Sequence, residues 1–163
     1  MTLPEHKEMT EKEVKAAEYR GKLKVRADKI KKTDDQVKFS VQAELKSRKF
    51  LCFRQDNPYL LIERSMKNNS KSQKMLRVER TGVKFDTTNP WWDTMQLGMT
   101  EFCNNDKYLP IRFSVYSFSN SGPNQMYGSV TCTTRDIEML PEAKKELKIK
   151  DSKGKVTGKL EFK

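Results

Sequence analysis

The chain has 163 residues, of which 35% are hydrophobic and 34% are charged, and its mean hydropathy is −0.87. This length predicts one domain, and no run approaches the roughly 18 apolar residues that a bilayer-spanning helix needs. The 33 basic residues outnumber the 22 acidic ones and give a net charge of +11, which favours an anionic partner: a lipid surface, an acidic protein or a nucleic acid.

The polar N-terminus lacks the features of a secretory signal, and the cysteines suit a reducing compartment, so we expect a cytoplasmic protein. Cys52, Cys103 and Cys132 form no CxxC pair, and His6 is the only histidine, which argues against a disulfide framework or a zinc site. No phosphate-binding loop or nucleophile motif is present. We therefore expect no enzyme and no cofactor.

The N-terminal region has a helix signal, because Thr10 and Glu13 form a capping-box pattern that predicts a short helix through Tyr19, closed by Gly21. Residues 1–21 are thus expected to be a helical extension, and residues 22–163 the main domain. From Lys22 onward the hydrophobic period changes to two, which is typical of half-buried strands.

Alternation and turn residues predict eight to nine short strands and one capped helical turn at residues 134–138. The strands are expected at residues 22–27, 37–43, 59–66, 75–83, 93–97, 110–118, 127–133, 145–150 and 156–162. The last two should form a hairpin over residues 151–154. This pattern predicts an all-β antiparallel sandwich.

Three motifs, in this order, resemble those of a C2 domain, and most closely the second C2 domain of copines. They are Asn57-Pro58-Tyr59-Leu60, then Arg80-Thr81-Gly82-Val83 followed by Asn89-Pro90-Trp91-Trp92, and a strand–loop–strand from Val115 to Ser129. The resemblance runs from about Lys22 to Phe162. It implies an eight-stranded antiparallel C2-type β-sandwich in which Pro90 and Trp92 belong to the core and Trp91 is more exposed.

The resemblance also implies where calcium would bind, because carboxylates from two loops hold the ion in calcium-binding C2 domains. The matching positions here are Asn57, Ser117, Ser119 and Gln125, none of which is a carboxylate. Asp56, one residue away, could supply a single ligand. Calcium takes six to eight oxygen ligands, several of them charged. We therefore expect that the calcium function has been lost.

The first of these loops is basic and partly apolar. It carries Lys46, Arg48, Lys49 and Arg54, interleaved with Phe50, Leu51 and Phe53. Either the apolar side chains enter a membrane beside the charges, or they pack beneath the loop. Both alternatives remain open at the level of sequence.

Two functions follow. The first is a calcium-independent, non-catalytic module that binds an anionic phospholipid surface or an acidic protein, located peripherally on a membrane. The second is a structural subunit of a large assembly, axonemal, cytoskeletal or ribonucleoprotein, in a cilium or the cytoskeleton. The charge leaves nucleic acid open as a partner, but no RNA-binding motif supports it.

Overall fold

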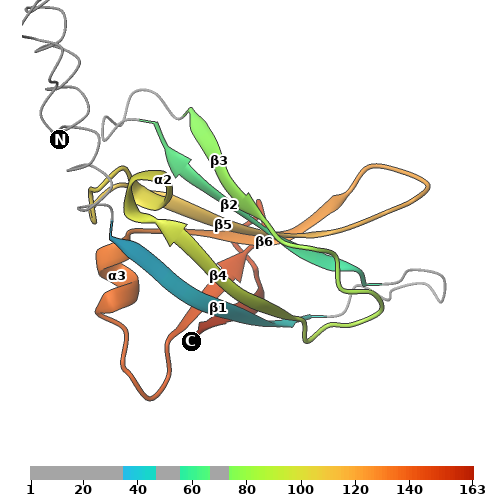
Figure 1. Cartoon of the computed structure of the whole chain (residues 1–163). Helices are drawn as coiled ribbons and strands as arrows, with labels where there is room; N and C mark the ends of the chain where they lie inside the picture. The colour runs from blue at the N-terminus through green and yellow to red at the C-terminus, as the bar shows by residue number, and fades with distance from the viewer. Residues whose placement is uncertain (1–34, 47–55, 67–73) are drawn as a thin grey trace, which may run out of the picture. The chain divides into compact units, whose positions relative to one another are not determined.

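The computed structural model describes residues 35–46, 56–66 and 74–163. The strands are β1 (Gln36–Leu45), β2 (Pro58–Ser65), β3 (Met75–Arg80), β4 (Trp91–Gly98), β5 (Ile111–Ser117), β6 (Gln125–Cys132), β7 (Glu146–Lys150) and β8 (Val156–Phe162), and the helices are α2 (Met99–Cys103) and α3 (Thr134–Glu138). All neighbouring strands pair antiparallel, in the order β3-β2-β5-β6-β7-β8-β1-β4. The expected all-β, eight-stranded antiparallel class is confirmed (Figure 1).

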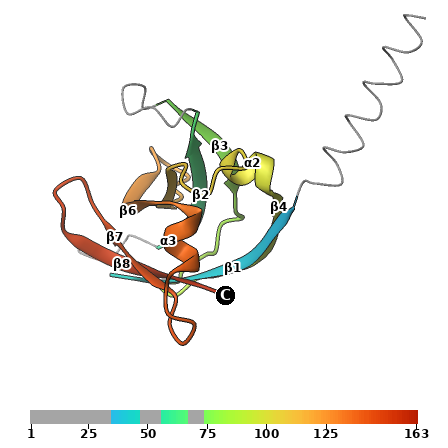
Figure 2. The same cartoon turned by 90° about the vertical axis from the view of Figure 1, so that its left-hand side faces the viewer.

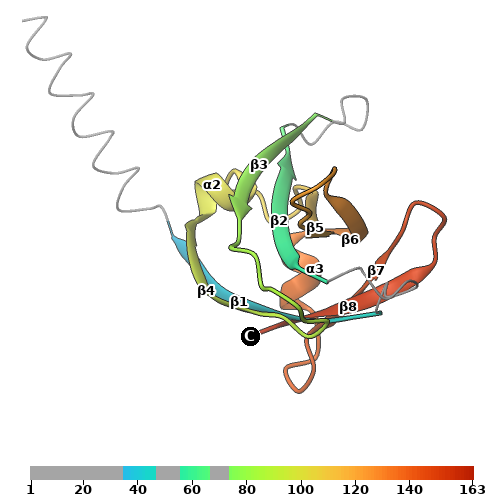
Figure 3. The ribbon, with the colours of Figure 1, turned by 90° about the vertical axis from the view of Figure 1, so that its right-hand side faces the viewer.

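The eight strands form two layers because the sheet narrows between β6 and β7, where Ser129 and Lys150 make the single residue pair. One layer holds β3, β2, β5 and β6, and the other holds β7, β8, β1 and β4 (Figures 2 and 3). Aromatic rings fill the space between them. Phe113 meets Phe162 edge to face with ring centroids 5.1 Å apart, and Phe39 lies 5.5 Å from Phe102. Each such pair of rings contributes about 0.5–1.5 kcal/mol to stability beyond the contribution from burying its apolar surface.

Several element boundaries differ from those predicted. Strand β4 begins at Trp91 instead of residue 93, because Trp91 and Trp92 pair with Gln42 and Val41 of β1. Strand β3 ends at Arg80 instead of residue 83. The predicted extension over residues 1–21 and the predicted strand at 22–27 lie outside the described residues.

Both helices are one-turn elements at the end of the sandwich where β1 begins. The predicted helical turn at 134–138 is confirmed as α3. Its N-cap is Thr133, whose hydroxyl accepts from the Asp136 amide at 3.1 Å while the Asp136 carboxylate accepts from the Thr133 amide at 2.8 Å. Helix α2 was not predicted. It buries Phe102 and Cys103 against the core.

Gly158 marks a place where β8 and β1 approach too closely for a side chain. A Cβ there would lie 2.6 Å from the backbone oxygen of Glu44 and 3.1 Å from the Leu45 side chain. Gly158→Ala should therefore lower the free energy of unfolding by about 1–3 kcal/mol, as overpacking does. Urea denaturation would measure the change. Gly82→Ala is the matched control because nothing lies within 4 Å of its added Cβ. Equal midpoints for the two variants would contradict the prediction.

Candidate functional site

Three connecting segments meet at the end of the sandwich away from α2 and α3, and we call this the loop end (Figure 1, right). It consists of Lys46, Asp56 and Asn57 from the β1–β2 connection, residues 81–90 between β3 and β4, and residues 118–124 between β5 and β6. Backbone hydrogen bonds join the segments. The Thr87 amide donates to the Asp56 oxygen and the Phe118 amide to the Asn57 oxygen, both at 2.9 Å.

Asn57 is the link among these segments. Its side-chain oxygen accepts from the Asp86 amide at 2.9 Å, and its side-chain nitrogen donates to the Phe118 oxygen at 3.4 Å. Its backbone amide donates to the Ser117 hydroxyl at 3.2 Å. The amide side chain thus uses both its donor and its acceptor within the protein, and it holds the loops together at a position where the family resemblance would place a carboxylate.

The other three positions that the resemblance assigns to calcium lie around the β5–β6 turn. Ser117 pairs with Gln125 across the two strands. The Ser119 amide donates to the Asn124 side-chain oxygen at 3.0 Å, and Asn124 donates in turn to the Tyr59 hydroxyl at 3.0 Å. Within the described residues, no cluster of three or more histidine, cysteine, aspartate or glutamate side chains could hold a metal ion.

Asp56, the nearby carboxylate, faces the interior. It is only 2% exposed, and one of its oxygens accepts a hydrogen bond from the hydroxyl of the fully buried Tyr127. A buried carboxylate needs such a partner, because an unpaired one would be strongly destabilising. Asp56 therefore anchors the β1–β2 connection to β6.

The loop end also exposes basic and apolar side chains. Lys46 is exposed, Lys84 is half-buried, and Phe85 is 67% exposed. The other predicted surface-binding residues lie outside the described residues: Arg48, Lys49, Phe50, Leu51, Phe53 and Arg54. Phe85 was missed by the sequence reasoning. The sequence feature that could have revealed it is an aromatic residue between two charged residues, Lys84 and Asp86, in a turn.

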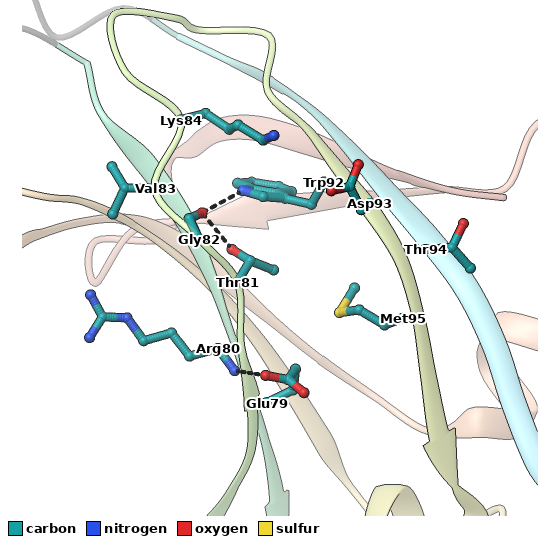
Figure 4. A pocket seen from close by; sticks show the side chains of 10 residues that line it. All are labelled: Glu79, Arg80, Thr81, Gly82, Val83, Lys84, Trp92, Asp93, Thr94 and Met95. Atoms are coloured by element: carbon teal, nitrogen blue, oxygen red, sulfur yellow. Dashed lines mark hydrogen bonds between the residues drawn. The ribbon is translucent and has the colours of Figure 1, made fainter.

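Pro90 and Trp92 close the open side of the sandwich, between the two edge strands. Pro90 is buried, Trp92 is 2% exposed, and the Trp92 indole nitrogen donates to the Gly82 oxygen at 3.2 Å (Figure 4). A groove of about 250 Å³ lies there, lined by residues 79–84 and 92–95. Trp91, by contrast, is 55% exposed.

The outer face of the β3-β2-β5-β6 layer carries arginines that already have partners. The Arg80 guanidinium lies 4.2 Å from the centroid of the Tyr59 ring. Arg112 donates two hydrogen bonds to one Glu63 oxygen, at 3.1 and 2.9 Å. An arginine held this way is less available to an external anion than an exposed basic residue such as Lys46 at the loop end.

The buried cysteines have no properties of a nucleophile. Burial, together with the nearby Asp136 carboxylate, raises the pKa of Cys132 to about 12. Its thiol therefore stays protonated at neutral pH, whereas the thiolate is the reactive form. Cys103 is also buried and free.

Comparisons with known proteins agree on one family for this chain. The model of the C2 domain matches residues 13–150. Copine-A of Dictyostelium discoideum is 23% identical over 123 residues, covering 76% of this chain and 20% of copine-A. The chain thus spans about a fifth of the length of that relative.

Solved structures agree on the fold. The chain resembles BON1-C2B with a TM-score of 0.61 and 18% identity, over 78% of this chain and 85% of that one. It resembles a C2 domain of plant Extended Synaptotagmin 1 with a TM-score of 0.51 and 22% identity, over 77% and 89%. In the described part of the chain, no helix has the length and apolar character needed to cross a bilayer.

Proposed function

Because the chain belongs to the C2 domain family, whose members bind membranes or proteins, we propose that it binds an anionic membrane surface without calcium and without a catalytic step. The observation that carries this proposal is the composition of the loop end. Uncharged residues occupy the four positions that the family resemblance assigns to calcium, while basic and apolar side chains are exposed beside them.

Calcium independence is supported by the side chains at those four positions, considered as ligands for the ion. Asn57, Ser117, Ser119 and Gln125 supply no charged oxygen, and the Asn57 side chain is already bonded to Asp86 and Phe118. Asp56 is bound to Tyr127 in the interior. Since calcium sites depend on several carboxylates, this set of donors does not suit the ion.

Attraction to an anionic surface is supported by where the excess charge lies. The described residues hold 18 basic and 15 acidic side chains, whereas residues 47–55 hold three basic and no acidic ones. Residues 47–55 belong to the connection that Lys46 begins. Each basic residue close to an anionic leaflet contributes about 1 kcal/mol. Phe85, and Phe50 and Phe53 in the same connection as Lys46, would add apolar contact with the lipid interface.

A structural role in a large assembly is the second candidate, and the outer face of the β7-β8-β1-β4 layer favours it. Lys159 lies 3.2 Å from Glu44 and 3.1 Å from Glu146, and Lys163 lies 3.8 Å from Glu161. These ion pairs neutralise part of the face, and the 55% exposed Trp91 lies on its edge strand. Tryptophan is enriched at protein interfaces.

Binding to vesicles that contain phosphatidylserine tests the first candidate. The protein should bind equally in chelator and in about 1 mM calcium, which would saturate even weak extracellular-type sites. It should bind more weakly at about 0.5 M salt, because the Debye length then falls well below 10 Å. Neutral phosphatidylcholine vesicles are the control. Binding that requires calcium would refute calcium independence, and no binding to either vesicle would leave the assembly role as the better candidate.

A further inference from the structure

The β7–β8 hairpin ends beside the loop end. The Lys46 amide donates to the Thr157 oxygen at 2.9 Å, and Leu45 pairs with Gly158, so the start of β8 lies against the end of β1 (Figure 3). The turn of this hairpin carries three exposed lysines, Lys150, Lys153 and Lys155, which we call the lysine tip. From the sequence, residues 151–154 are predicted only as the turn of a hairpin.

The backbone of the lysine tip is held in place by hydrogen bonds within the turn. One oxygen of the Asp151 carboxylate accepts from the amides of Lys153 and Lys155, at 2.9 and 3.0 Å. The Asp151 amide donates to the Lys155 oxygen at 3.0 Å, and Gly154 takes the left-handed conformation with φ of 79°. A glycine adopts that conformation without strain. The tip is thus ordered before any ligand arrives.

The lysines of the tip differ from most other lysines of the same hairpin region, the exception being Lys148 of β7, which is exposed and in no ion pair of the described residues. Within the described residues, Lys144, Lys145, Lys159 and Lys163 each lie within 4 Å of a carboxylate, at distances of 3.1 to 3.8 Å. No ion pair of the described chain includes Lys150, Lys153 or Lys155. The one carboxylate of the turn, Asp151, accepts hydrogen bonds from backbone amides and pairs with none of the three lysines, which outnumber it and leave the tip with a net positive charge.

The direction of the hairpin depends on Gly128 of β6. A Cβ at this position would clash with the Thr157 hydroxyl and would lie 3.0 Å from the Lys150 carbonyl. The missing side chain lets the hairpin pack closely on β6, at the point where the two layers join. The fold therefore sets where the lysine tip projects.

We propose that the lysine tip is a second contact with the anionic membrane, binding the phosphate groups of lipid headgroups beside Lys46 at the loop end. The proposal rests on the membrane-binding function proposed above. A lysine ammonium is a compact charge with three donors and is a common ligand of phosphate. The unpaired charge and its continuity with Lys46 favour a lipid surface, because both groups lie at the same end of the domain.

Charge reversal at the tip tests the proposal. Lys153→Glu/Lys155→Glu should weaken binding to phosphatidylserine vesicles by at least about 30-fold, which corresponds to about 1 kcal/mol per lost lysine. The matched control is Lys38→Glu/Lys74→Glu, which changes the net charge equally at the opposite end of the domain. Both of its lysines are exposed. Because charges farther than about 8 Å are screened at physiological salt, the control should change affinity by less than about 3-fold. Thermal melting would check that both variants fold.

The outcomes separate this proposal from the function on which it rests. If the wild type binds and the tip variant binds equally well, the tip is not a contact although the membrane function stands. An equal loss in the tip variant and the control would mean that only net charge matters, which also overturns the proposal. If the wild type binds no vesicle, both fail. A loss confined to the tip variant supports the contact.

Discussion

Trp92→Ala should lower the free energy of unfolding by about 3–5 kcal/mol, the range for removing a large aromatic side chain from a core. The indole is 2% exposed between the two layers, and it also donates to the Gly82 oxygen. Its loss would leave a cavity and remove one of the two hydrogen bonds that the Gly82 oxygen accepts, the other coming from the Thr81 hydroxyl. Since small domains unfold at a total cost of about 5–15 kcal/mol, this change would remove a large part of the total stability. Urea denaturation followed by far-ultraviolet circular dichroism measures the change.

Trp91→Ala is the natural control, because it removes the same side chain at the adjacent position. Trp91 is 55% exposed, so its loss should alter stability by less than about 1 kcal/mol. Trp92→Phe separates packing from hydrogen bonding, since it keeps an aromatic ring without the N–H donor. If Trp92→Ala melted within a few degrees of the wild type, the role of this indole in the core would be wrong.

Replacing Lys46, Arg48, Lys49 and Arg54 together with glutamate should abolish binding to phosphatidylserine vesicles. Four basic residues at about 1 kcal/mol each correspond to a loss of about 1,000-fold, and the added negative charges would increase it. Lys46 is exposed, and surface charge changes usually alter stability by less than about 0.5 kcal/mol, so the domain should stay folded. Vesicle co-sedimentation and a melting curve measure the two effects.

The role of the apolar residues in this connection can be resolved in the same assay. If Phe50 and Phe53 enter the membrane, Phe50→Ala/Phe53→Ala should weaken vesicle binding and leave the melting temperature unchanged. If they pack beneath the loop, the melting temperature should fall. Retained binding by the four-residue glutamate variant would show that the β1–β2 connection is not the membrane contact.

The strands were predictable from the sequence because alternation reports a buried face directly. Phe39, Val41 and Ala43 are buried in β1 as their spacing indicated. The start of β4 was not predictable from the local pattern, since Pro90 favours a turn while pairing of Trp91 with Gln42, far away in sequence, extends the strand. Helix α2 has only five residues, too few to show a helical period. It is held by burial of Phe102 and by left-handed residues at Asn104 and Asn105.

The candidate site was predictable only in part. The family resemblance placed Asn57 and Ser117 at one site, and the structure brings them into contact across 60 residues of sequence. Phe85 and the lysine tip were missed for a physical reason. A local pattern reveals a turn, but the end of the sandwich that a turn occupies depends on strand order. Two turns that look alike in sequence can therefore face opposite ends.

The narrow junction between β6 and β7 has a consequence for amide hydrogen exchange. Strand β5 is paired along its length on both sides, whereas β7 is paired fully with β8 and joins β6 through Ser129 and Lys150. Strands with few cross-strand hydrogen bonds open locally at a lower free energy than central strands. Deuterium should therefore enter β7 before β5. The two layers should therefore separate first along the junction between β6 and β7. Strands β7 and β8 should then move away from β6 as one unit, while β8 stays paired with β1.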